Sequence, residues 1–422
     1  MKQKLLLLVF TLLLLFAMVE ITISFLTVTD SDGNMSLNYI HLKPYKLPIH
    51  ETEKKINALL QHKVADSIYN TKPIRKFKNV RLVPDTLLGW LPSPCYKGKN
   101  NIYIYNKDAI RSETTNIEYA KGKRIRIAIF GDSYSHGDEV PFENTIGYYL
   151  QHLFTKKNFD VEVINFGVSG YGIDQAYLRW QSTKKKFNPD IIILGVQFEN
   201  VKRHINILRP FYYFITKIPY SKPRFVLRKG ALVKISNPIK HIEKTVDIIR
   251  NFHNWKFANY EGFYSRENYS SNIFYYSKTV SFVVSALSQI FNEIDYYKPE
   301  SESYKITYKL ITQFKNDVTA EGKYFVPVHL PVKNDLDFLT GKFLKFMYNQ
   351  KFIYDKLFSE LKEGNKFVEP YDSLKQYADK YGINKLFMKR HYSPVANKII
   401  AEKIFNFITT NYNTLFIPEK NK

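Results

Sequence analysis

The chain has a single cysteine, Cys95, among its 422 residues. A lone cysteine excludes an internal disulfide framework, a structural zinc site built from cysteines and a Cys-x-x-Cys redox motif. Acidic residues are also scarce, because 39 Asp and Glu stand against 62 Lys and Arg and leave a net charge of +23. The sequence contains no internal repeat. The hydrophobic share of 45% is ordinary, so we expect a globular protein that folds by burial alone.

The positive charge suggests a nucleic-acid-binding protein, but its distribution argues against one. Lysine is spread along the whole chain and accompanies abundant Asn, Ile, Tyr and Phe, which is typical of a biased overall composition. The densest cluster, Lys184–Lys186, is expected to end a helix, where cations suit the negative end of the helix dipole. We therefore expect no nucleic-acid partner. A positive surface would still favour acidic partners such as anionic polysaccharide or lipid headgroups.

Residues 1–29 form a predicted signal anchor. An apolar run begins at Leu5 and continues to Val28 with Glu20 as its one charge, which is about 24 residues and long enough to span a bilayer. Lys2 and Lys4 precede the run, and acidic residues follow it, so the positive-inside rule keeps the N-terminus in the cytoplasm and exports the rest. A cleaved signal peptide is the alternative, although no small-x-small cleavage site follows the run.

The rest of the chain is predicted to form a juxtamembrane linker, one large domain and a short tail. Residues 30–80 are polar and proline-containing and form the linker, with one short helix near 51–69. Residues 81–412 form the domain, and residues 413–422 form the tail. Within the domain, residues 203–305 are rich in Tyr, Phe and Pro, show few clear periods, and are expected to form an insert that covers the cleft.

The domain alternates predicted strands and helices. Strands are expected at 124–130, 161–165, 191–194, 324–328 and 366–368, and helices near 146–154, 173–185, 303–318, 336–362, 371–380 and from 394 onward. This order predicts an α/β fold with a central parallel sheet covered by helices on both faces. The last helix starts at Ser393-Pro394, a capping serine followed by proline at the first helical position.

Chemically useful residues follow three of these strands and precede the last helix. The carboxyl ends of parallel strands meet at one edge of a sheet, where such folds bind ligands. Gly131-Asp-Ser133 follows the first strand, glycine-rich 167–172 the second and Asn200 the third, and His391 precedes the last helix. Each alone has an ordinary explanation, namely a capping serine, a flexible loop, a turn asparagine or an exposed histidine. The glycine spacing does not fit a dinucleotide site. Together the four blocks are much more specific than any one of them.

Together these blocks resemble those of the SGNH (GDSL-type) hydrolase superfamily. The Gly-Asp-Ser at 131–133 matches the first block, Gly170 the glycine of the second, Asn200 the asparagine of the third and His391 the last. The resemblance covers about residues 80–410. Residues 85–90 (Asp-Thr-Leu-Leu-Gly-Trp) and 106–111 (Asn-x-x-Ala-Ile-Arg) also look like the leader segment of membrane-anchored members associated with bacterial cell-surface polysaccharide, including alginate acetylation proteins.

The resemblance implies a flavodoxin-like three-layer α/β/α fold and acyl-ester chemistry that needs no metal and no organic cofactor. Ser133 would be the nucleophile, and His391 would act as general base and then general acid. The backbone N–H groups of Ser133 and Gly170 and the side-chain amide of Asn200 would form the oxyanion hole.

One departure from the family pattern concerns the acid of the triad. The family usually has an Asp two or three residues before the histidine, where this chain has Lys389 and Met388. Three alternatives remain open from the sequence: a distant acid such as Asp372 substitutes, a Ser–His dyad works with a backbone carbonyl, or the site is weakened.

The leading hypothesis is a membrane-anchored, extracytoplasmic esterase or O-acyltransferase that acts on acyl esters of cell-envelope polysaccharide. Hydrolase and transferase share the acyl-enzyme and differ in whether water or a sugar hydroxyl takes the acyl group; a transferase would draw on a membrane-embedded acyl-donor partner. The alternative, motivated by the missing Asp, is a non-catalytic polysaccharide-binding or assembly subunit on a degenerate hydrolase scaffold. A lipid esterase at the membrane surface is a third interpretation.

Overall fold

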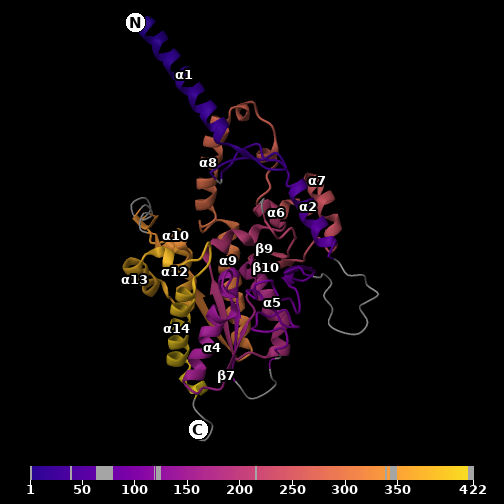
Figure 1. The fold of residues 1–422 in the computed structure, drawn as a ribbon, viewed down its shortest axis with the longest axis vertical. Coiled ribbons are helices and arrows are strands. Elements are labelled where there is room, and N and C mark those ends of the chain that lie inside the picture. Colours follow the sequence, from indigo (N-terminus) through magenta and orange to yellow (C-terminus); the bar gives the residue numbers. More distant parts are fainter. Residues whose placement is uncertain are drawn as a thin grey trace. The chain divides into compact units, whose positions relative to one another are not determined.

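The computed structural model describes residues 2–38, 40–62, 79–117, 119, 125–213, 216–337, 340–342 and 349–416 (Figure 1). The chain divides into two compact units, neither of which is continuous in sequence. Unit 1 contains residues 1–58, 206–220 and 241–296, and unit 2 contains residues 59–205, 221–240 and 297–422.

Unit 2 is built on a parallel sheet with the strand order β11-β8-β6-β7. The strands are β6 (Ile125–Phe130), β7 (Val161–Asn165), β8 (Ile191–Val196) and β11 (Tyr324–His329). A single parallel bridge from Val328 to Val368 is all that forms of the strand predicted at 366–368. The predicted α/β fold with a central parallel sheet is confirmed.

Helices cover both faces of this sheet. Successive side chains of a strand point to opposite faces, so each apolar strand offers side chains to the helices on both sides. On one face, Ile127 and Ile129 of β6 join the apolar core beneath α4 (Ile146–Lys156) and α14 (Pro394–Asn411), which lie side by side in Figure 1. On the other face, Phe130 stacks on Phe166 and meets Phe314 of α9 (Glu302–Ala320), which packs beside α5 (Ile173–Phe187). The apolar strand runs thus contribute to a core on both faces of the sheet.

The remaining elements of unit 2 surround the sheet. Two antiparallel hairpins pair β4 (Leu82–Asp85) with β5 (Gly89–Pro92) and β9 (Arg224–Arg228) with β10 (Ala231–Ile235). The shorter elements are α3 (Ser133–His136), η2 (Phe142–Asn144), η3 (Phe198–Ile205), α10 (Lys333–Leu336), α12 (Asp355–Gly364) and α13 (Tyr371–Tyr381). Of the helix predicted near 336–362, residues 338–339 and 343–348 lie outside the described residues, as do residue 124 of the first strand and 417–422 of the tail.

Unit 1 combines the N-terminal segment with most of the predicted insert. It contains α1 (Lys2–Leu26), a small antiparallel sheet of β1 (Val28–Thr29), β2 (Met35–Leu37) and β3 (Ile40–His41), and the helices α2 (Ile49–Leu60), α6 (Arg209–Tyr212), α7 (Thr245–Arg250) and α8 (Lys278–Asp295). Residues 30–58, expected to belong to a linker, therefore form strands and a helix. The helix predicted near 51–69 appears as α2, and residues 63–69 lie outside the described residues.

The longest helix missed from the sequence is α8. Its buried residues are Ser281 and Ser285, which bond to the backbone of Lys43, whereas Val283 and Leu287 are about half exposed. The helix therefore buries its small polar face and leaves apolar residues outside, which reverses the pattern by which a surface helix is recognised.

Candidate active site

Ser133 stands at the end of β6, on a turn that only a glycine-containing sequence can make. Gly131 has φ +148°, and a Cβ there would lie 2.2 Å from Ser135 Oγ and 3.0 Å from the carbonyl oxygen of Gly195. Asp132 then caps the short helix α3, because its side chain accepts a hydrogen bond of 2.9 Å from the N–H of Tyr134. Ser133 is the first residue of α3, so its own N–H has no acceptor within the helix.

His391 meets this serine. The Nε2 atom of His391 lies 2.9 Å from Ser133 Oγ, although the two residues are 258 positions apart in the sequence. The loop that carries the imidazole is held in place, since Tyr134 Oη donates to the carbonyl of Arg390 at 2.9 Å and Tyr392 Oη donates to that of Pro331 at 2.6 Å. Ser393 caps α14 directly after it. The distance is that of a hydrogen bond through which the serine proton can pass to the imidazole.

The carboxylate beside His391 is Glu139. Its Oε1 lies 3.3 Å from Nδ1 of His391, within ion-pair distance although the two groups are not aligned as a hydrogen bond. Its Oε2 accepts the backbone N–H groups of Arg390 at 2.9 Å and of His391 at 3.3 Å. Glu139 therefore both braces the histidine loop and places a negative charge at the nitrogen opposite the serine.

The environment of Glu139 keeps this carboxylate charged. Partial burial works to raise its pKa, but the hydrogen bonds from Arg390 and His391 and the nearby imidazole outweigh burial, so the pKa lies below its ordinary value. The backbone of Glu139 is in the left-handed region at φ +71°, which costs a non-glycine residue on the order of 1 kcal/mol. Its N–H donates to Tyr103 Oη at 3.0 Å, one of the contacts that hold this conformation.

Asp372, considered from the sequence as the distant acid, lies elsewhere. It occupies the first turn of α13, where its side chain is 86% exposed and lies 3.7 Å from the ammonium of Lys351. An exposed carboxylate paired to a lysine cannot orient a partly buried imidazole. The structure thus corrects the sequence-based suggestion, because the residue that faces His391 is Glu139.

The candidate oxyanion donors gather around Ser133. Asn200, in η3 after β8, donates from Nδ2 to Asp132 Oδ2 at 2.8 Å, which leaves the second hydrogen of the same amide for a substrate oxygen. The oxyanion loop, residues 166–172 after β7, bonds to the serine turn through the N–H of Val168 and the carbonyl of Gly131 at 3.1 Å. This loop carries Gly170, so all three predicted donors lie on connected segments at one sheet edge.

A buried polar network ties the oxyanion loop to the segment that carries Glu139. Asp138 lies 2.6 Å from Nδ1 of His136, and Ser169 Oγ lies 2.7 Å from both of its carboxylate oxygens. The other ring nitrogen of His136 is 3.0 Å from Tyr105 Oη. Burial lowers the pKa of His136 to about 4, so the ring is neutral at neutral pH. Ser169 precedes Gly170, so the network fixes the oxyanion loop against residues 136–139.

The two leader segments support the same loops. Trp90 Nε1 donates to the carbonyl of Ser169 at 3.0 Å, and Tyr171 Oη donates to the carbonyl of Trp90 at 2.6 Å. From the second segment, Arg111 donates to the carbonyl of Val140, the residue after Glu139, at 2.7 Å. Both segments therefore act as a support beneath the site, a function that their sequences alone did not reveal.

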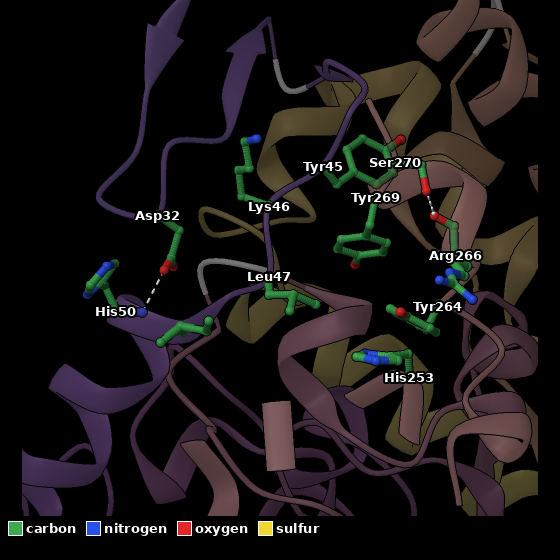
Figure 2. Close-up of a pocket in the computed structure, with 11 residues that line it drawn as sticks. Asp32, Tyr45, Lys46, Leu47, His50, His253, Tyr264, Arg266, Tyr269 and Ser270 are labelled. Carbon is green, nitrogen blue, oxygen red and sulfur yellow. Dashed lines mark hydrogen bonds between the residues drawn. The ribbon is translucent and has the colours of Figure 1, made fainter. Parts of the chain in front are cut away.

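Neither a metal cluster among the described residues nor the cavity of unit 1 offers a second catalytic site. Among the described residues, no group of three or more His, Cys, Asp or Glu side chains could hold a metal ion. The cavity of unit 1, about 480 Å³, includes both a histidine, His253, and a serine, Ser270, in its lining (Figure 2). Ser270 Oγ donates to the carbonyl of Arg266 at 2.8 Å, so this serine is not paired with the histidine as a nucleophile.

Sequence reasoning missed Glu139, although a signal was present. Asp138 and Glu139 follow the Gly-Asp-Ser block within six residues, and two adjacent acids there are available to the same strand edge. The contact with His391 spans 252 positions, so only the folded chain shows which acid reaches the imidazole.

Comparison with known proteins finds no match among protein-family models and none among curated proteins. Similar solved structures include TesA, at 9% identity over 68% of this chain and 98% of that chain, with a TM-score of 0.34. The psychrotrophic esterase EstA from Pseudoalteromonas sp. is similar at 10% identity over 68% and 99% of the chains, with a TM-score of 0.33. Axe2, an acetyl xylan esterase from Geobacillus stearothermophilus, is similar at 12% identity over 68% and 95%, with a TM-score of 0.36. These likenesses are weak, and the chemistry of this chain follows from the distances in its own site.

Proposed function

We propose that the protein is a membrane-anchored, extracytoplasmic esterase or O-acyltransferase of the SGNH type. The observation that carries the proposal is the 2.9 Å contact between Ser133 Oγ and His391 Nε2. Glu139 adds the third member of a Ser–His–acid arrangement, and the oxyanion loop with Asn200 adds donors for a developing negative charge.

The first half of the reaction would form an acyl-enzyme. Ser133 Oγ attacks the carbonyl carbon of an ester while its proton passes to Nε2 of His391, and the carbonyl oxygen gains the negative charge. Collapse of this intermediate breaks the ester C–O bond, and the imidazolium returns the proton to the leaving alcohol. The carboxylate of Glu139 stabilises the imidazolium between these two steps.

The second half would transfer the acyl group to water or to a sugar hydroxyl. His391 takes the proton of the incoming hydroxyl as its oxygen attacks the acyl carbon, and returns it to Ser133 Oγ when the serine leaves. The residues are the same for both acceptors, so the choice between hydrolysis and transfer depends on which acceptor occupies the cleft. A transferase would receive its acyl group from a donor partner in the membrane.

The proposed anchor is α1. Among the described residues it is the one helix that is long and apolar enough to cross a membrane. Lys2 and Lys4 at its start favour a cytoplasmic N-terminus, and this supports the proposed extracytoplasmic location of the site. Glu20 of α1 accepts hydrogen bonds from residues 277–279, so cleavage after a signal peptide would remove a contact of the folded unit. This contact supports a retained anchor.

The proposed substrate class is acyl esters of cell-envelope polysaccharide. The net charge of +23 favours an acidic polymer, and the leader segments at 85–90 and 106–111 resemble those of members that act at the cell surface. The alternative remains a non-catalytic polysaccharide-binding or assembly subunit, which would leave the serine–histidine pair unused.

Labelling with a fluorophosphonate tests the proposal, because the probe modifies only activated serine hydroxyls. We expect modification of the full chain in detergent at Ser133, and none in Ser133→Ala or His391→Ala. Unlabelled wild-type protein would contradict the proposed enzyme. In cells, unchanged envelope O-acylation in Ser133→Ala, together with its loss on deletion of the protein, would favour the binding subunit. Release of acetyl groups in water, against their transfer to added saccharide, separates esterase from transferase.

A further inference from the structure

A short turn of unit 1 exposes three large apolar side chains. The turn is η8 (Ile273–Tyr276), in which Ile273 is 76% exposed, Phe274 66% and Tyr276 84%. Single exposed apolar residues are common on soluble proteins, but three within four residues form a contiguous apolar patch, and such patches mark binding surfaces.

Hydrogen bonds fix this turn beside the predicted anchor helix. The carboxylate of Glu20, within α1, accepts the hydroxyl of Ser277 at 2.7 Å and the N–H groups of Lys278 at 2.7 Å and Thr279 at 2.9 Å. These residues form the N-terminus of α8, which begins beside the C-terminal part of α1 in Figure 1. The turn η8 ends at the residue before Ser277.

The same contact explains a charge that is otherwise costly. A carboxylate inside an apolar membrane-spanning helix is unfavourable unless it is hydrogen-bonded. The first N–H groups of an 18-residue helix lack acceptors of their own and carry the positive end of its dipole. Glu20 therefore caps α8 from another helix, and each group satisfies the other.

The position of Glu20 along α1 sets the depth of the turn. A hydrocarbon core of about 30 Å takes about 20 helical residues, so a span that starts at Leu5 ends near Ser24. Glu20 then lies about 6 Å inside the outer boundary of the core. Ser277, bonded to Glu20, and the adjoining turn η8 then come close to this level, near the outer boundary of the hydrocarbon core.

Hydrogen bonds to Asn272 also brace the turn. Asn272 accepts the N–H of Phe274 on its side chain at 3.0 Å and that of Tyr275 on its carbonyl at 2.9 Å. On its other side, α8 is fixed by Ser285, whose hydroxyl accepts the N–H of Lys43 at 3.0 Å. Hydrogen bonds thus brace both the turn and the helix that follows it.

We propose that η8 is a second membrane contact of the protein, in which Ile273 and Phe274 enter the outer leaflet at the acyl-chain boundary. Tyr276 lies at the headgroup level, where the amphipathic tyrosine ring is favoured. The occupant of this apolar surface is the lipid bilayer that contains α1, so the inference rests on the anchor proposed above. Together with α1, the turn fixes the orientation of unit 1 on the membrane.

Site-specific fluorescence in liposomes tests this contact. The full chain carrying Cys95→Ser would receive one new cysteine at a time, Phe274→Cys in the turn, Leu14→Cys in α1 or Asn254→Cys at an exposed position of unit 1. Each cysteine is labelled with an environment-sensitive dye, and the protein is reconstituted with lipids that carry a quenching spin label near the headgroup or deep in the chain.

The dye at position 274 is expected to shift to the blue and to be quenched several-fold more than the dye at position 254, most strongly by the shallow quencher. Adding Glu20→Leu should abolish this quenching at position 274 and preserve it at position 14, because the anchor stays apolar while the cap is lost. Strong quenching at position 14 with none at position 274 would overturn the inference and leave the anchor intact. Absence of quenching at position 14 would overturn both. A blue shift at position 274 that neither lipid quencher affects would indicate a protein partner and contradict the proposal.

Discussion

Replacing Glu139 with glutamine should remove most of the activity without unfolding the site. Glu139 Oε1 lies 3.3 Å from Nδ1 of His391. Opposite unit charges at that separation attract by about 5 kcal/mol at an effective dielectric constant of about 20, and by about 1.3 kcal/mol in bulk water. The Glu139 side chain is 25% exposed, so the interaction lies between these limits. At about 1.4 kcal/mol per factor of ten, we expect kcat/KM to fall about 10²-fold.

Two variants of Glu139 separate its charge from its other contributions. Glu139→Gln retains an oxygen that can accept the N–H groups of Arg390 and His391, so the loop should keep its place. Glu139→Gly removes the carboxylate and both of its hydrogen bonds to the histidine loop, and it also relieves the left-handed backbone at φ +71°, so it should lose more activity than Glu139→Gln. Steady-state kinetics on an acetyl ester and thermal unfolding measure both effects. Wild-type kcat/KM in Glu139→Gln would refute a role for the charge.

Three further predictions concern the acid, the oxyanion loop and the buried histidines. Asp372→Asn should leave kcat/KM at its wild-type level, because this carboxylate is exposed and faces Lys351; a large loss would restore Asp372 as the acid. Trp90→Phe removes the hydrogen bond to the oxyanion loop and leaves a buried carbonyl without its donor, so stability should fall by about 1–3 kcal/mol and kcat should fall more than KM changes. Burial lowers the pKa of His136 and His204 from 6.5 to about 4 and that of His329 to about 3. Below pH 6.5 the unfolded chain therefore binds protons at these histidines that the folded chain does not bind. The free energy of unfolding, measured with denaturant, should be highest above pH 6.5 and fall as the pH drops toward 4, by up to about 1.4 kcal/mol per pH unit for each histidine. A flat profile over this window would contradict the burial of these histidines in the neutral form.

The sheet could be predicted from the sequence because each buried parallel strand is a short apolar run between turn residues. The strand predicted at 161–165 coincides with β7, and the capping Ser393 with Pro394 located the start of α14. The meeting of Ser133 and His391 was predictable because they lie at a strand end and before a helix start, which converge at one edge of the sheet.

The acid and unit 1 could not be predicted in the same way. The pairing of Glu139 with His391 depends on a left-handed backbone and on a contact across 252 residues, neither of which a local pattern contains. Unit 1 joins segments from three parts of the chain. Its helix α8 packs through Ser281 and Ser285 rather than through an apolar face, so periodicity gave no indication of it.

Trapping the acyl-enzyme tests the central claim most directly, namely that Ser133 is a nucleophile activated by His391. The purified full chain would be mixed rapidly with an activated acetyl ester, quenched in acid and examined by mass spectrometry of its peptides. We predict one acetyl group on Ser133 in wild-type protein and none at this position in His391→Ala. An unmodified Ser133 under turnover, or ester cleavage that persists in Ser133→Ala, would contradict the account.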